Sequence, residues 1–599
     1  MTAPAIAAPV ASHADAPLKP AGTREFTVRA AIAAMIVAAV IGASYPYIVM
    51  KLGFGPNISV VSAFFGFLAL GLVSKTYNRW ENNIVQAAGT SAGQTAFLCV
   101  LMAAFDMLKY DPTLHFPLQL THLQAFLWLT TAGVLGVLLA VPLRRHYIID
   151  ENLTFADGVA AAETLIVLDS RGKEGVDAAR AMGFASLLSA VLMAMRADAR
   201  LLRAAWYRIP EMLPFGTLGG KMNVGIGWSL LNIGSGMLVG MRINTSMLVG
   251  SLLAWVVAPP LLLRYGSVDE LLRRKVLLWV MWPATGMLVA GGLMALVLRW
   301  NVLARSFRTF TGAKVSGDEF PARWVVIGVA ISGVALVVVQ HTMLGTPVWM
   351  TLVAMAVSLV FMLVGLRVMG ETNWGPISAL SNMMQGVFGV LAPGNIVANM
   401  TSSGVTGSIV SQSEGIMQNY KTGHMIGSTP RYLTWAQLMA VPVGAVTVAF
   451  AYPLLRDTYG LAGGPGGDLP GALQSPISQK WAGFARLLSA GLSALPRGAV
   501  QALVVGALLG VVFTLLEGTK LKKWTPSPTG VGIGMLVPGS AIVSMFIGGV
   551  LGEIWKKLSP AGAQRQLVPV ASGFIAGEAI VAVLIPILVK IGLVHLVDG

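Results

Sequence analysis

The sequence contains little charge and almost no cysteine. Only 11% of its 599 residues are charged, against about 25% in an average soluble domain. The single cysteine, Cys99, excludes an intrachain disulfide. The seven histidines are scattered and no Cys or His cluster has metal-site spacing, so neither a metal centre nor a cofactor is expected. The absence of a Walker A pattern argues against ATP hydrolysis by this chain.

What the sequence has instead is a series of long apolar runs. Hydrophobic residues make up 55% of the chain, and the mean hydropathy is +0.73. Runs such as residues 30–50, 276–298 and 567–589 are long enough to cross a hydrocarbon core about 30 Å thick. About 14 to 16 such segments predict an all-α polytopic membrane protein. Clusters of Gly, Pro, Asn and Ser within them predict that some helices are broken or re-entrant.

The distribution of charge fits the same interpretation. Lys and Arg number 41 against 26 Asp and Glu, and the basic residues lie in short loops such as 143–147, 196–208 and 264–275. Basic residues are enriched in cytoplasmic loops, so the excess is interpreted as membrane topology, and no nucleic-acid partner is expected. The first 22 residues lack the apolar core of a signal peptide. We predict a multi-pass protein of the cell membrane, which would be the inner membrane of a bacterium.

Short motifs recur in the two parts of the chain. Four pairs occur in the same order, and they begin at Asn83 and Asn395, Val224 and Val531, Ser246 and Ser544, and Pro283 and Pro569. They predict two homologous tandem halves, residues 24–305 and 323–599, joined by a linker at 306–322 and preceded by a disordered tail at 1–23. Paired repeats with a site between them are typical of secondary transporters. Basic loops at equivalent places favour halves of the same orientation.

Two polar stretches match each other across the halves, NNIVQAAGTSAGQT (82–95) and GNIVANMTSSGVTGS (394–408). Small residues permit close helix packing, whereas unwound polar segments line transport pathways. Because the stretches match, we favour the second interpretation and expect them to face each other across a shared cavity. The expected lining groups are Asn83, Gln86, Ser91, Asn395, Asn399, Thr401, Ser402 and Ser403.

Ionisable residues provide the remaining candidates. Glu414, Gln418 and Lys421 follow the second stretch, and a charge at membrane depth usually marks a pathway. We predict that they contact charged ends of a substrate, and the alternative is a solvated loop. Glu163 and Glu578 lie among small and apolar residues, where burial disfavours the ionised carboxylate. We predict that these two acids couple transport to protons, and the alternative is a structural acid.

Three segments carry a family resemblance. The residues MQNYKTGHMIGSTPRYLTWAQ (417–437) resemble a pattern of the oligopeptide transporter (OPT) family, which includes the yellow stripe-like transporters. In that pattern an acid follows MQ, and Asn419 stands at its place here. NLTFADGVAAAET (152–164) and ASGFIAGEA (571–579) resemble two further segments of the family.

The resemblance implies a helical membrane fold in two halves and a secondary, cation-coupled importer of small peptides or peptide-like metal chelates, such as iron–siderophore complexes. Proton coupling is what the resemblance suggests, and composition alone does not show it. The implied partners are the substrate, protons and the lipid bilayer, and a homodimer is left open. Two alternatives are a passive channel for small polar solutes and an intramembrane enzyme, for which the sequence offers no reactive dyad.

Overall fold

The computed structural model describes residues 19–593, except for residues 21, 53–57, 74–76, 112–113, 115, 170–172, 197–208, 211, 299–318, 373–374, 470–471, 491–496 and 592. The described chain is almost entirely helical. Most of the predicted tail and most of the predicted linker lie outside the described residues, so the boundaries between the halves stay predictions.

The elements before the linker are α1 (Val28–Leu52), α2 (Ile58–Val73), α3 (Arg79–Ala96), α4 (Cys99–Tyr110), α5 (His122–Ala140), η2 (Val141–Leu143), η3 (Arg145–Asp150), α6 (Ala156–Asp169), α7 (Lys173–Met195), β1 (Met212–Pro214), α8 (Gly216–Met222), β2 (Gly225–Gly227), α9 (Leu230–Val239), α10 (Met241–Leu252), η6 (Leu253–Val257), α11 (Ala258–Arg264) and α12 (Arg273–Val297). The two short strands pair antiparallel, Met212 opposite Gly227.

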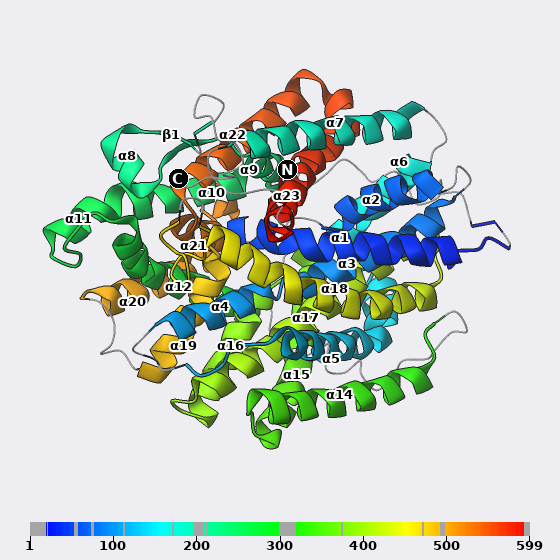
Figure 1. The fold of residues 1–599 in the computed structure, drawn as a ribbon, viewed down its shortest axis with the longest axis horizontal. Coiled ribbons are helices and arrows are strands. Elements are labelled where there is room, and N and C mark those ends of the chain that lie inside the picture. The colour runs from blue at the N-terminus through cyan, green and yellow to red at the C-terminus, as the bar shows by residue number, and fades with distance from the viewer. Residues whose placement is uncertain are drawn as a thin grey trace.

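The elements after the linker are α14 (Ala322–Leu344), α15 (Val348–Thr372), α16 (Ile377–Leu391), α17 (Ile396–Ile426), α18 (Pro430–Tyr459), α19 (Pro476–Ala490), α20 (Ala499–Glu517), η8 (Lys520–Lys523), α21 (Pro528–Leu536), α22 (Gly539–Leu558) and α23 (Pro560–Lys590). Helices α3, α5, α6, α15, α16 and α18 pack directly on α17, which Figure 1 shows among α5, α15, α16 and α18.

Many of these helices have the length and composition of membrane spans. Within the described residues, nine helices are long and apolar enough to cross a membrane, and four shorter apolar helices accompany them. A hydrocarbon core offers the backbone no water to bond, so apolar runs there must satisfy their N–H and C=O groups within helices. The prediction of an all-α polytopic membrane protein is confirmed.

Helix α17 explains how a polar stretch can occupy the middle of such a protein. The Asn395 side chain caps its start by accepting a hydrogen bond from the Ala398 amide at 2.9 Å, and Gly427 ends it in the left-handed conformation. Its 31 residues correspond to a length of about 46 Å. Every residue from Ala398 to Gly423 is buried. The surrounding helices therefore shield the polar side chains of α17 from lipid.

Two segments are broken helices, as the sequence predicts. Gly240, with φ +87°, separates α9 from α10, and Pro538 lies between α21 and α22. Helices α9 and α21 have 10 and 9 residues, fewer than the roughly 20 that a span requires. Both breaks fall just before a recurring Ser-Met motif, at Ser246 and Ser544.

The matching polar stretches are not unwound. Residues 82–95 lie within α3, and residues 396–408 are the regular beginning of α17. The expectation of irregular backbone there is therefore wrong. Their small residues serve close packing instead, because Gly89 lies directly against Ser62 of α2.

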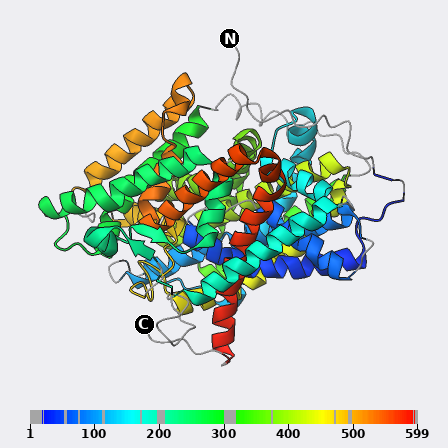
Figure 2. The same cartoon turned by 90° about the horizontal axis from the view of Figure 1, so that it is seen from above.

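Glycine also brings helices from distant parts of the chain into close contact. Gly573 of α23 lies against the Met182 carbonyl of α7, and Gly506 of α20 lies against the Pro283 carbonyl of α12. In the view of Figure 2, α20 (orange) runs along α12 (green). A side chain at either glycine would separate the two backbones.

We predict that Gly573→Ala destabilises the protein by about 1–3 kcal/mol, because its Cβ would collide with the Met182 carbonyl. The measurement is thermal unfolding of the detergent-purified protein. Gly183→Ala is the matched control on α7, since its Cβ would meet no atom within 4 Å. Alanine is the better helix former by about 1 kcal/mol, so the control should be neutral or stabilising. Equal effects of the two substitutions would contradict this packing.

Candidate functional site

Several predicted residues form a buried polar seam between α3, α17 and α18. The Gln86 amide donates to Asn419 Oδ1 at 2.9 Å, and Ser91 Oγ donates to Gln412 Oε1 at 3.2 Å. Gln437 of α18 links these two hydrogen-bonded pairs, because its Nε2 donates to Gln412 Oε1 and its Oε1 accepts from Asn419 Nδ2. All five side chains are buried. The seam is a closely bonded helix interface, and it stabilises the contact between the three helices.

The hydrogen bonds between α3 and the α17 region also show the relative direction of these two helices. Asn83, near the start of α3, donates to Ser428, which lies just beyond the end of α17, at 2.7 Å. Ser91, further along α3, contacts Gln412, which lies earlier in α17. The two helices are therefore antiparallel, and Asn83 and Asn395 lie at opposite ends of the pair. The expectation that the Asn-Ile-Val segments face each other is wrong.

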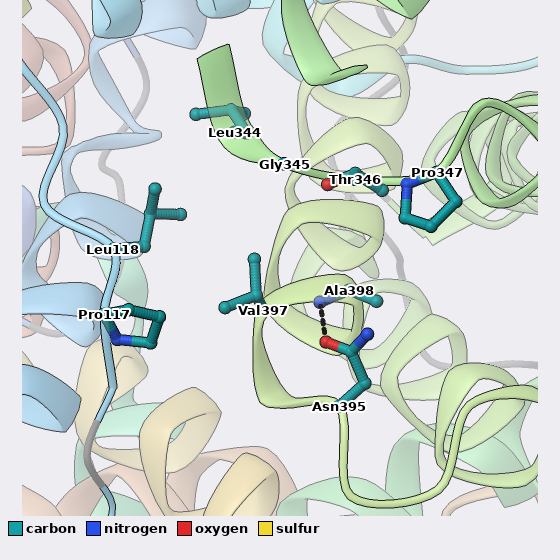
Figure 3. A pocket seen from close by; sticks show the side chains of 9 residues that line it. All are labelled: Pro117, Leu118, Leu344, Gly345, Thr346, Pro347, Asn395, Val397 and Ala398. Carbon is teal, nitrogen blue, oxygen red and sulfur yellow. Dashed lines mark hydrogen bonds between the residues drawn. The ribbon is translucent and has the colours of Figure 1, made fainter. Parts of the chain in front are cut away.

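The remaining lining candidates lie along the first turns of α17. Asn395 lies at an external pocket of about 370 Å³ lined mainly by apolar residues, and Figure 3 shows its side chain bonded to the Ala398 amide. Thr401 contacts the Thr346 hydroxyl at 3.2 Å. Asn399 donates to the Gln385 carbonyl of α16 at 2.7 Å.

The hydroxyls of Ser402 and Ser403 have no hydrogen-bond partner among the described residues, although both side chains are buried.

The three predicted substrate contacts are also buried by protein. Gln418 accepts from the Gly158 amide at 2.6 Å, and Lys421 donates to Asn152 Oδ1 at 2.8 Å. These bonds hold α17 against the beginning of α6. Both carboxylate oxygens of Glu414 lack a hydrogen-bond partner among the described residues. These residues are thus inside the bundle, and the alternative of a solvated loop does not apply.

The two predicted proton-coupling acids differ from each other. Glu163 is exposed on α6, so the burial on which its prediction rested is absent. Glu578 is buried, but it is not isolated. Its carboxylate accepts hydrogen bonds from Lys51 at 2.7 Å, Arg196 at 2.8 Å and Ser229 at 2.8 Å. The apolar surroundings expected for Glu578 are therefore wrong, because its partners come from segments distant in sequence, and its role in coupling stays a prediction.

A polar cavity of about 230 Å³ lies beside this Glu578 cluster. Three of its lining residues are cations, Lys51, Arg196 and Arg273, and the described lining residues include no Asp or Glu. Its other polar lining residues are Tyr47, Asn223, Ser229, Asn232, Tyr459, Gln474 and Ser540. We refer to this site as the cationic cavity.

The broken helices contribute directly to the cationic cavity. Ser229 is the N-cap of α9, and Ser540 lies in the first turn of α22. Helix N-termini carry partial positive charge. The N-terminus of α9 already binds Glu578 through the Leu231 amide, and that carboxylate offsets one of the three cationic charges. Arg273 is held in place by Gln474 Oε1 at 2.8 Å and stacks over Trp255. Such an arrangement favours an anionic ligand, carboxylates above all.

Sequence reasoning did not select the cations of this cavity. Arg196 and Arg273 lie at the edges of basic loops that were interpreted as topology, and Lys51 ends an apolar run. The available signal was the broken segment at residues 221–246, where Asn223 and Asn232 occur among many glycines. Discontinuous helices of this kind often surround transporter sites.

Comparisons with known proteins agree with the fold and with the resemblance. The family described as OPT oligopeptide transporter protein matches residues 25–589. A protein of Saccharomyces cerevisiae that carries the name of an oligopeptide transporter is 22% identical, covering 96% of this chain and 98% of its own length. A metal-nicotianamine transporter of Arabidopsis thaliana is 23% identical, with coverage of 94% and 93%. The iron-phytosiderophore transporter yellow stripe 1 of Zea mays is 22% identical, with coverage of 93% and 89%.

We predict that Glu578→Gln destabilises the protein by about 3–5 kcal/mol, because it leaves the buried Arg196 and the partly buried Lys51 without their shared anion. Thermal unfolding in detergent measures the change. Asp269→Asn is the control, since that carboxylate pairs with Lys275 in an exposed loop and its loss should leave stability unchanged. A Glu578→Gln protein as stable as the wild type would show that the cluster is not required.

Proposed function

The chain belongs to the oligopeptide transporter family, and we propose that it is a secondary active, proton-coupled importer of small peptides or peptide-like metal chelates in a cell membrane. The names of its relatives support this substrate class, because they include oligopeptide, metal-nicotianamine and iron-phytosiderophore transporters. Both kinds of substrate present carboxylates and amides, so one polar site can serve either.

We propose that the substrate binds in the cationic cavity. The observation that carries this proposal is the position of Lys51, Arg196 and Arg273 around one space between the two parts of the chain. Its lining residues between 47 and 273 come from the part of the chain before the predicted linker, and those between 459 and 541 come from the part after it. Cations and helix N-termini would bind the carboxylates of a substrate, while Asn223 and Ser540 offer groups for its amides.

Reciprocal packing supports two related halves. The recurring motifs make α10 equivalent to α22 and α12 equivalent to α23, and chain order makes α9 equivalent to α21 and α7 to α20. Helix α9 contacts α22, and their equivalents α21 and α10 also contact each other. Likewise α12 contacts α20, and their equivalents α23 and α7 contact each other. The equivalent helices α3 and α17 are antiparallel, which is typical of inverted repeats and argues against halves of the same orientation.

The size of the cavity bears on the transport cycle. Pockets for drug-sized ligands have volumes of about 300–1,000 Å³, and the cationic cavity is smaller. A metal chelate would therefore need its walls to separate. The breaks at Gly240 and Pro538 are places where short half-helices can move relative to their neighbours without unwinding a complete span.

The passive channel is the alternative that experiment must separate from this proposal. A channel equilibrates its solute, whereas a coupled transporter accumulates it against a gradient. Proteoliposomes with an imposed pH gradient distinguish the two. Uptake that stops at equal concentrations inside and outside, for every peptide and ferric siderophore tested, would favour the channel.

We predict that Arg273→Gln raises the KM for an anionic substrate by about 10- to 100-fold, because a charge-assisted hydrogen bond contributes about 1.5–3 kcal/mol. The measurement is initial uptake of a labelled dipeptide and of a metal–nicotianamine complex into proteoliposomes. Arg264→Gln is the matched control, since Arg264 is exposed on α11 and is absent from the cavity lining. An unchanged KM for both substrates would place the binding site elsewhere.

A further inference from the structure

Glu414 is a buried acid that the substrate site does not use. Its side chain is 1% exposed and lies in the middle of α17. The carboxylate lies against the backbone of Gly365 in α15 and of Gly375, just before α16, and a Cβ at Gly375 would collide with it. Neither carboxylate oxygen has a hydrogen-bond donor within the described part of the chain.

The charged groups around Glu414 are engaged with one another. Arg367 of α15 pairs with Glu151, which also contacts His146 of η3 at 3.2 Å. Lys421, two turns further along α17, donates to Asn152. The elements that contact α17 also carry other titratable groups, which include Arg79 and Glu81 on α3, His122 on α5, Arg145, Tyr147 and Asp150 on η3, Asp157, Glu163 and Asp169 on α6, Arg431, Tyr432, Tyr452, Arg456, Asp457 and Tyr459 on α18, and Lys480 and Arg486 on α19. No described cation pairs with Glu414.

An unpaired carboxylate in such a place would be costly, because burial removes its water and nothing replaces it. The protonated carboxyl is neutral and avoids most of that cost. The geometry therefore requires a proton on Glu414 in this conformation, and any movement that brings water or a cation to the carboxyl would release it.

Polar groups lie along one face of α17 between its first turn and Val410, which precedes Glu414 by one turn. Positions 399, 403, 406, 407, 410 and 414 share one face of α17 by helical periodicity. On this face Asn399 Oδ1 and Ser403 Oγ are buried and lack partners in the described structure. Ser381 of α16, whose hydroxyl is also unpartnered there, lies against Gly407. Free acceptors at successive turns are the groups that water or a travelling proton would use.

The two ends of this row of polar groups differ. At one end, Asn395 precedes Asn399 by one turn and lines the external pocket shown in Figure 3. At the other, Val410 occupies the turn before Glu414 and separates the carboxyl from the hydroxyls. In the proposal below, the proton approaches from the pocket, and a shift of α15 or α16 away from Val410 opens its way to Glu414.

We propose that Glu414 is the site that binds and releases the coupling proton, reached along this face of α17 from the pocket at Asn395. The proposal rests on the proposed function, since a coupling proton has meaning only in a transporter. It differs from the substrate role predicted for Glu414, and it assigns coupling to an acid without a counter-ion instead of to Glu578.

The test compares Glu414→Gln with wild type in proteoliposomes containing the full chain. One assay measures peptide accumulation under a pH gradient of one unit, which allows about a 10-fold concentration ratio for one proton per peptide. The other measures exchange of labelled for unlabelled peptide without a gradient. The Gln variant should accumulate no peptide above equilibrium yet retain exchange. The control is Glu553→Gln, an exposed carboxylate on α22, which should behave as wild type.

Three results would overturn the role proposed for Glu414 without refuting the proposal that the wild-type protein transports peptides or chelates. They are undiminished accumulation by Glu414→Gln, loss of exchange together with accumulation, and wild-type accumulation driven by a Na⁺ gradient alone. Glu414→Asp supplies a second variant that keeps a titratable acid, so it should still accumulate peptide with a shifted pH profile, and an unshifted profile would also count against Glu414. Failure of the wild type to transport any peptide or chelate would instead refute the proposed function.

Discussion

The structure depends on the cost of placing charge where water is absent. Each charged group inside the bundle has to find a partner within the protein. Glu578 shows how this is done, because one carboxylate joins Lys51, Arg196 and Ser229 and thereby ties α1, α9 and α23 together. The cationic cavity lies beside this cluster, and Glu578 is the anion that pairs with two of its cations, Lys51 and Arg196.

Polar residues inside the bundle fall into two kinds of environment. Those of the seam, such as Gln412 and Gln437, use their donors and acceptors on one another and hold helices in place. Those at the broken helices line the cationic cavity, where we propose that the substrate binds. In the transport cycle that we propose, the contacts between α3, α17 and α18 stay fixed while the short half-helices α9 and α21 move.

The sequence was sufficient for the fold class, the broken helices and the family, since these follow from apolar run lengths, glycine clusters and local motifs. It was not sufficient for the site. Asn83 and Asn395 match in sequence, but the antiparallel contact of their helices separates them. Glu163 and Glu578 have similar neighbours along the chain, yet one is exposed and the other is ion-paired. Local sequence does not contain the long-range contacts that decide these differences.

The most direct measurement of the central claim is a cryo-electron microscopy structure of the protein with a bound dipeptide or metal–nicotianamine complex. The account predicts ligand density within the cationic cavity, with carboxylates near Arg273 and the first turn of α22. Density at the pocket beside Asn395, or within a separated seam between α3 and α17, would contradict it.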